Sequence, residues 1–217
     1  WYTLSLHDAL PISLQQGGYE EALGHFATAR KLAPDDVGSL FLIGVTQRRQ
    51  RAFEAALETF DKVAEIDRDY PGLALERGLV HEAAGRSEEA LKAYEAALAK
   101  APEDVDLKLR VGCGKAAGGR GADAEKLLRE VLSERPASAE TNHCLGRALL
   151  AKGADVTAAL RHLERATDLD PHRAEFHLYV GLAALEAGRI LQAQAALKRA
   201  LELDQSLADA YWQRGVL

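Results

Sequence analysis

Histidine and cysteine side chains are the groups in this chain that could bind a transition metal or act as nucleophiles. The chain holds seven histidines and two cysteines among its 217 residues. No two histidines have the i, i+4 spacing that places a pair of zinc ligands on one face of a helix. Because a metal site needs three or four convergent ligands, we expect no metal centre and no cofactor.

Two further features could suggest catalysis, and neither has the required context. The segment 112–115, Gly-Cys-Gly-Lys, lacks the first glycine, the Ser or Thr and the preceding strand of a phosphate-binding loop. Cys113 and Cys144 are too few for a disulfide framework, and we expect them to be small buried side chains rather than a nucleophile or a disulfide. With no catalytic constellation in view, we expect a protein that is not an enzyme.

Charge and hydropathy exclude other classes of function. The 27 basic and 33 acidic residues give a net charge of -6 and are interspersed, whereas a nucleic-acid binder needs clustered Lys and Arg. No apolar run approaches the roughly 20 residues of a transmembrane helix. Hydrophobic residues make up 47% of the chain and aromatic residues only 6%, so we expect a folded protein whose core consists of small side chains.

Small residues and prolines recur along the chain at a spacing of 34 residues, which lengthens once to 35. The glycine series is Gly44, Gly78, Gly112, Gly146, Gly181 and Gly215. The alanine series is Ala22, Ala56, Ala90, Ala124, Ala159 and Ala193. A third series, rich in proline, is Pro34, Arg68, Pro102, Pro136, Pro171 and Gln205. A fixed period of this length indicates stacked structural repeats, each unable to bury its apolar face alone.

Each repeat contains two stretches with the period of an amphipathic helix, for example 37–50 and 53–66. In most units the turn between them holds a glycine, which can adopt the left-handed conformation that ends a helix. These turn glycines are Gly17, Gly85, Gly119, Gly153 and Gly188. Arg51 takes that place in one unit. The sequence therefore predicts a repeat of helix A, turn and helix B, with the recurring Gly and Ala where the two helices approach most closely.

This pattern resembles the tetratricopeptide repeat, in which Leu-Gly, Gly-x-Tyr, Ala, an aromatic residue, Ala and Pro recur at fixed positions. In the third unit, for example, the matches are Gly78, Gly85, Ala90, Tyr94, Ala97 and Pro102. The resemblance implies an all-α fold, a right-handed α-solenoid superhelix of stacked antiparallel helix pairs. It divides the chain into a partial first repeat (mainly helix B), five whole repeats and the helix A of a seventh. Their ranges are 13–36, 37–70, 71–104, 105–138, 139–173 (with a one-residue insertion), 174–207 and 208–217.

Residues 1–12 fit none of the repeats. The segment 2–12 resembles the in-frame translation of a sequencing-library adapter, and Pro11 would interrupt a helix that later units form without proline. We interpret residues 1–12 as a non-native segment and expect the true N-terminus to be missing.

The resemblance also implies a binding surface, because the A helices of such proteins line the inner, concave face of the superhelix. Many of the side chains at the usual contact positions are apolar, and an exposed apolar stripe indicates an interaction site. We expect a groove for an amphipathic helix or extended peptide, with apolar anchors supplying affinity and Arg48, Arg49 and Arg147 matching charge. The predicted contact residues are Phe41, Val45, Arg48, Arg49, Leu75, Leu79, Glu82, Leu109, Cys113, His143, Arg147, Leu178, Leu182 and Trp212.

The expected function is a non-catalytic scaffold that binds a protein or peptide. One alternative is the repeat region of a larger bacterial enzyme, of sulfotransferase or glycosyltransferase type, with a catalytic domain beyond Leu217. Another is a pilus-assembly lipoprotein. The family's clamp for chaperone C-terminal carboxylates needs two asparagines, and the chain has only Asn142. A bacterial cytoplasmic or periplasmic location remains open.

Overall fold

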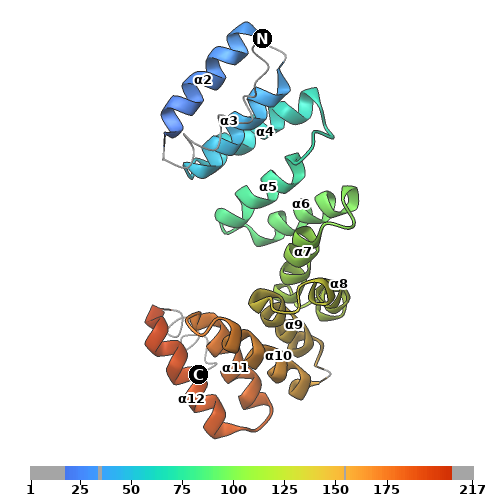
Figure 1. Ribbon diagram of the computed structural model, residues 1–217, viewed down its shortest axis with the longest axis vertical. Coiled ribbons are helices and arrows are strands. Elements are labelled where there is room, and N and C mark those ends of the chain that lie inside the picture. The colour runs from blue at the N-terminus through green and yellow to red at the C-terminus, as the bar shows by residue number, and fades with distance from the viewer. Residues whose placement is uncertain (1–17, 34–35, 154, 207–217) are drawn as a thin grey trace. The chain divides into compact units, whose positions relative to one another are not determined.

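The computed structural model describes residues 18–33, 36–153 and 155–206, and every regular element in these ranges is a helix (Figure 1). Two compact units divide the chain, unit 1 ending at Lys100 and unit 2 beginning at Ala101. The helices of unit 1 are α2 (Tyr19–Leu32), α3 (Val37–Arg49), α4 (Phe53–Ile66), α5 (Leu73–Ala83) and α6 (Ser87–Lys100). Those of unit 2 are α7 (Val105–Ala117), α8 (Gly121–Glu134), α9 (Ala139–Lys152), α10 (Val156–Leu169), α11 (Ala174–Glu186) and α12 (Ile190–Leu203).

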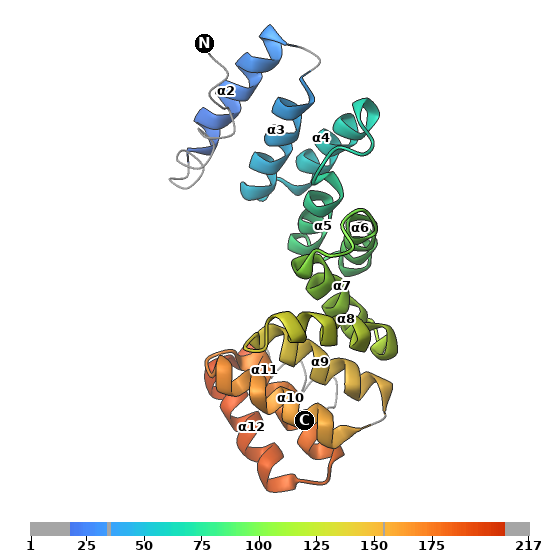
Figure 2. The same cartoon turned by 45° about the vertical axis from the view of Figure 1, so that its right-hand side comes forward.

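Consecutive helices pack as pairs, and the pairs stack within each unit. In unit 1, α3 packs on α4 and α5 on α6, while α4 also contacts α5. In unit 2 the pairs are α7 with α8, α9 with α10 and α11 with α12, as the lower part of Figure 2 shows for the last two. The helix A of each pair is therefore α3, α5, α7, α9 or α11. This arrangement confirms the predicted all-α solenoid of antiparallel helix pairs.

The turns between helices A and B confirm the predicted left-handed conformation. Gly85, Gly119, Gly153 and Gly188 have φ angles between 67° and 75°. Arg51 has a φ of 64° at the equivalent position and is the one non-glycine residue with positive φ in the described ranges. A Cβ atom in this region is crowded, so Arg51 holds a conformation that glycine adopts without strain. Gly17 lies outside the described residues.

The recurring glycine of each helix A lies against a large side chain of helix B, as predicted. A Cβ atom on Gly44 would lie 2.5 Å from the ring of Phe60, and one on Gly112 would lie 2.7 Å from Leu128. The recurring alanine is equally enclosed, since Ala56 has no exposed surface. Small residues at these points therefore set how closely the two helices of a repeat approach.

Several helix A segments begin at a polar residue that caps the first turn. The carboxylate of Asp36 accepts hydrogen bonds from the backbone N–H groups of Gly38 and Ser39 at the start of α3. Asp104 does the same at α7, and the Ser138 hydroxyl accepts one bond at α9. Such caps satisfy backbone donors that have no partner inside the helix, and so they fix where each helix A starts.

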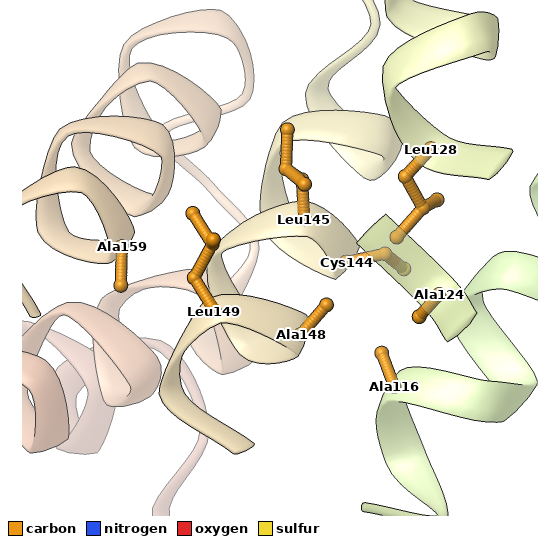
Figure 3. Close-up of a cluster of buried hydrophobic side chains, with 8 residues drawn as sticks. All are labelled: Ala116, Ala124, Leu128, Cys144, Leu145, Ala148, Leu149 and Ala159. Carbon is orange, nitrogen blue, oxygen red and sulfur yellow. The ribbon is translucent and has the colours of Figure 1, made fainter. Parts of the chain in front are cut away.

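The buried side chains form separate clusters, each joining neighbouring helix pairs. One cluster of unit 2 brings together side chains of α7, α8, α9 and α10, and Figure 3 shows Cys144 of α9 directed towards Ala124 and Leu128 of α8. Most members are small, as the composition predicted: Ala116, Ala124, Leu128, Cys144, Leu145, Ala148, Leu149 and Ala159. The stability of such a fold is a sum over neighbouring repeats rather than the property of one central core.

Candidate functional site

We use the term inner face for the predicted contact residues on the A helices. In unit 1 these residues lie on α3 and α5. Leu75 and Leu79 are partly buried and stand one turn apart on the same side of α5. Val45 on α3 is only 8% exposed and belongs to the core, so little of its side chain is available to a partner. Leu75 and Leu79 are therefore partly exposed apolar side chains of the inner face, and they lie outside the core cluster that contains Val45.

Phe41 joins the inner face of unit 1 to the core beneath it. Its ring packs against Tyr70, with centroids 4.9 Å apart, and against Phe60 at 5.7 Å. A Cβ atom on Gly72, which precedes α5, would lie 3.5 Å from the end of the Phe41 ring. Phe41 is partly buried, so it fills the space between α3 and the start of α5 and offers only part of its ring to a partner.

The charges on the inner face of unit 1 are only partly available to a partner. Arg48 Nε donates to Glu76 Oε2 at 2.7 Å, and these side chains retain 20% and 16% of their surface. Arg49 is exposed and makes no ion pair within the part of the chain that the structure describes. Glu82 is exposed and accepts a hydrogen bond from the Tyr94 hydroxyl. Of the two predicted arginines, Arg49 is thus the one whose charge remains unmatched.

The apolar inner face of unit 2 comes from α7 and α11. Leu109 and Leu182 are partly buried, whereas Leu178 has no exposed surface. Leu178 therefore packs inside unit 2 and offers no surface to a partner. Leu109 and Leu182 remain candidates.

His143 on α9 is also interior, with 3% of its surface exposed, so it offers almost no surface to a partner. Its ring stacks on Phe176 at a centroid distance of 4.6 Å and makes a T-shaped contact with Tyr179 at a centroid distance of 5.1 Å. Both ring nitrogens are buried without a hydrogen-bond partner in the described part of the protein. The Nε2 atom lies 3.5 Å from Glu175 Oε1, close enough for an electrostatic interaction.

Arg147 completes this cluster across α9 and α11. Its Nη1 atom lies 3.2 Å from Glu175 Oε1, and its guanidinium carbon lies 4.5 Å from the centre of the Tyr179 ring. The positive charge is therefore matched by a carboxylate and an aromatic face within the protein. Arg147 is thus occupied in joining two A helices, as Arg48 is in unit 1.

Burial and neighbouring groups shift the pKa values of His143 and Glu175. Removal from water lowers the pKa of His143 below its usual range, and the nearby Glu175 carboxylate only partly opposes this shift. Contact with His143, and the positive charges of Arg147 and Arg173, lower the pKa of Glu175 although burial opposes them. At neutral pH the cluster therefore holds a neutral imidazole beside an ion pair.

Cys113 and Cys144 form a disulfide, which corrects the expectation of two unlinked side chains. The bond joins α7 to α9, and the two Cα atoms are 5.1 Å apart. Residues 31 positions apart can meet in this way because a period of about 34 residues places successive A helices side by side. Cys113 therefore contributes a disulfide, not a free thiol, to the inner face.

Three residues that shape the inner face were not among the predicted contacts. Glu76, Phe176 and Tyr179 occupy helix A positions that the family's usual contact pattern does not include. A weak signal was present, because an acidic residue lies 28 positions after Arg48 and again after Arg147. Trp212, the last predicted contact, lies outside the described residues.

The described ranges contain no group of three or more His, Cys, Asp and Glu side chains placed to hold a metal ion. Within the same ranges no helix has both the length and the hydropathy needed to cross a bilayer.

Solved structures with a similar fold are repeat proteins of the same kind. MamA 41-end from Desulfovibrio magneticus RS-1 is 21% identical, with a TM-score of 0.67 over 79% of this chain and 97% of that one. YrrB, described as a TPR protein with an unusual peptide-binding site, is also 21% identical, with a TM-score of 0.67 over 87% and 97% of the two chains. At this level of identity the likeness concerns the fold alone. No curated protein sequence gives a significant match.

Sequence profiles agree with the observed helix pairs. One tetratricopeptide-repeat profile matches residues 12–71 and 145–208, and a second matches residues 71–112. Together with the stacked pairs and the small residues at their contacts, these matches show that the chain belongs to the tetratricopeptide-repeat family.

Proposed function

We propose that this protein is a non-catalytic scaffold that binds a peptide or helix of a partner protein on the inner face of its A helices. The observation that carries the proposal is the pair Leu75 and Leu79, two apolar side chains one turn apart on α5 that are only partly buried. Apolar side chains in this arrangement can receive the anchor residues of a bound segment. The peptide-binding site named for YrrB supports the same use of the fold here.

Among the three predicted arginines, Arg49 is the one without an ion-pair partner in the described ranges. Arg48 and Arg147 are held by Glu76 and Glu175, so neither is free to pair with a partner without losing an internal contact. An acidic residue of the partner near Arg49 would supply electrostatic complementarity at an exposed position, where it affects association rate more than affinity. The apolar contacts at Leu75 and Leu79 therefore carry most of the proposed affinity.

Unit 2 offers a second, smaller set of contacts. Leu109 and Leu182 keep part of their surface, and Leu185 at the end of α11 is 38% exposed. Because Leu178, His143 and the disulfide occupy the intervening positions, these leucines do not form one continuous stripe. We therefore expect unit 1 to supply the main anchors.

The experiment that tests the proposal is a selection from a random peptide library displayed on phage. We expect selected peptides to carry spaced apolar residues, and a bound peptide to slow amide hydrogen exchange in α3 and α5. Protection confined to the B helices α4 and α6, or no enrichment of any peptide, would contradict the proposal.

A further inference from the structure

We propose that the Cys113–Cys144 disulfide is a redox-controlled link between two repeats, opened by a dithiol reductant and closed again by oxidation. The bond connects the A helices α7 and α9, and the 31-residue separation of its cysteines encloses the whole of α8. It therefore holds together the one interface at which α7, α8 and α9 meet.

The two cysteines differ in their surroundings. Cys144 is 4% exposed and lies in the cluster of small apolar side chains that Figure 3 shows. Cys113 is only partly buried and packs at the edge of that cluster, on the inner face of α7. A reductant approaching from solvent would therefore meet the Cys113 sulfur first, because attack on a disulfide requires access to one of its sulfur atoms.

Non-covalent packing also joins the helices at this interface, through buried side chains such as Leu128 and Leu145. Many of the side chains that pack between α7 and α9 are small, such as Ala116 and Ala148, and each buries little apolar surface. The ion pair of Lys152 with Glu125, which joins α9 to α8, leaves 43% of the lysine side chain exposed and contributes little. The disulfide adds a covalent link to this packing, and its loss should loosen the two repeats.

The reaction is a thiol–disulfide exchange in two steps. A thiolate of the dithiol attacks the Cys113 sulfur, the Cys113–Cys144 bond breaks, and Cys144 leaves as a thiolate that takes up a proton. The second thiol of the reductant then attacks the mixed disulfide and releases Cys113 as a thiol, while the reductant becomes a cyclic or paired disulfide. Two electrons and two protons pass from the dithiol to the cysteine pair.

The link would respond to the environment of the protein. Oxidising compartments maintain such bonds, whereas glutathione and thioredoxin-type dithiols in the cytosol reduce them. Reduction would break the disulfide next to His143, the residue that directly precedes Cys144 on α9. The inner face of unit 2 would then be less rigid in the reduced protein than in the oxidised protein.

The test compares the whole chain, oxidised in air and after treatment with dithiothreitol. Iodoacetamide labelling under denaturing conditions should modify no cysteine in the oxidised protein and two in the reduced protein, by mass spectrometry. Reduction should lower the thermal midpoint by about 5–10 °C and speed amide exchange in α7 and α9, leaving α3 and α4 unchanged. The matched control is the double variant Cys113→Ala and Cys144→Ala, whose thermal midpoint should not respond to dithiothreitol.

Two results would overturn the proposal. One is the labelling of both cysteines in the air-oxidised protein, which would mean that the bond does not form. The other is an unchanged thermal midpoint and unchanged exchange in α7 and α9 after complete reduction. Neither measurement involves a bound peptide, so the outcome is independent of the proposed binding function.

Discussion

Arg48 on α3 and Glu76 on α5 form an ion pair, with Nε and Oε2 2.7 Å apart and both side chains largely buried. The pair ties successive repeats together on the inner face of unit 1. It also neutralises the charge of Arg48, which was expected from the sequence to match a charge on a partner. A position that the family's usual pattern gives to partner contacts therefore serves here to join two A helices.

Breaking this pair should destabilise the protein. Replacing Glu76 with Gln leaves the buried Arg48 guanidinium without its counter-charge, and we expect the free energy of unfolding to fall by about 1–3 kcal/mol. Urea denaturation monitored by circular dichroism measures the change. The control Arg49→Gln, at an exposed position, should stay within about 0.5 kcal/mol of the wild type. Equal losses in the two variants would show that the Arg48–Glu76 contact contributes nothing specific.

The close contact of Gly44 with Phe60 predicts opposite effects for two glycine substitutions. In Gly44→Ala the new Cβ atom would meet the Phe60 ring at 2.5 Å, and we expect a loss of about 1–3 kcal/mol despite the better helix propensity of alanine. Gly24 in α2 has no atom within 4 Å of the corresponding position, so Gly24→Ala should stabilise the protein by about 0.5–1 kcal/mol. Urea unfolding midpoints distinguish the two. An unchanged unfolding midpoint for Gly44→Ala would mean that α3 and α4 can move apart without losing stability.

The left-handed backbone at Arg51 predicts that glycine is the better residue there. Arg51→Gly removes a strained conformation and should raise the free energy of unfolding by about 0.5–1 kcal/mol. The guanidinium carbon of Arg51 lies 5.9 Å from the Phe53 ring, and losing this weak contact offsets part of the gain. Arg51→Ala serves as the control, because it loses the contact and keeps the strain. Both variants are compared by thermal unfolding, and a less stable glycine variant would refute this explanation.

The buried imidazole of His143 predicts acid sensitivity. Because burial lowers its pKa in the folded state, the unfolded chain binds the proton more readily, and stability decreases as the pH falls below the ordinary value of about 6.5. We expect the urea midpoint to drop between pH 7.5 and pH 5.0, and His143→Leu to reduce that drop. His172→Gln, at an exposed position, should leave the drop unchanged. The same decrease in all three proteins would assign the effect to other groups.

The helix pairs and their close contacts could be predicted from sequence because each repeat imposes the same steric requirement. A glycine at the position of Gly44 and an alanine at the position of Ala56 recur in all five whole repeats, since only small side chains fit where helices A and B cross. The turn conformation followed from the same recurrence, and it holds even where arginine replaces glycine at position 51.

The surroundings of the inner-face residues could not be predicted from sequence, because the residue types at these positions do not recur. The partners of Arg48 and Arg147 lie on the next helix A at positions without a fixed residue type, so only the structure shows that these charges are matched. His143 and Leu178 occupy contact positions yet lie inside, because burial there depends on neighbouring side chains rather than on the repeat. The disulfide was not predicted for a similar reason. Cysteine occurs once on α7 and once on α9 and does not recur in other repeats, so the sequence pattern gives no indication that the two are bonded.

The central claim, that the inner face of unit 1 binds a peptide, is tested most directly by an affinity measurement. A peptide selected on the wild-type protein is labelled with a fluorophore, and its dissociation constant is measured for Leu79→Glu and for Leu32→Glu. Leu79 belongs to the inner face, whereas Leu32 is 84% exposed at the end of α2 and serves as the matched control. We expect Leu79→Glu to weaken binding at least about tenfold and Leu32→Glu to change it by less than about twofold. Equal affinities of the two variants, with both folded by circular dichroism, would contradict the claim.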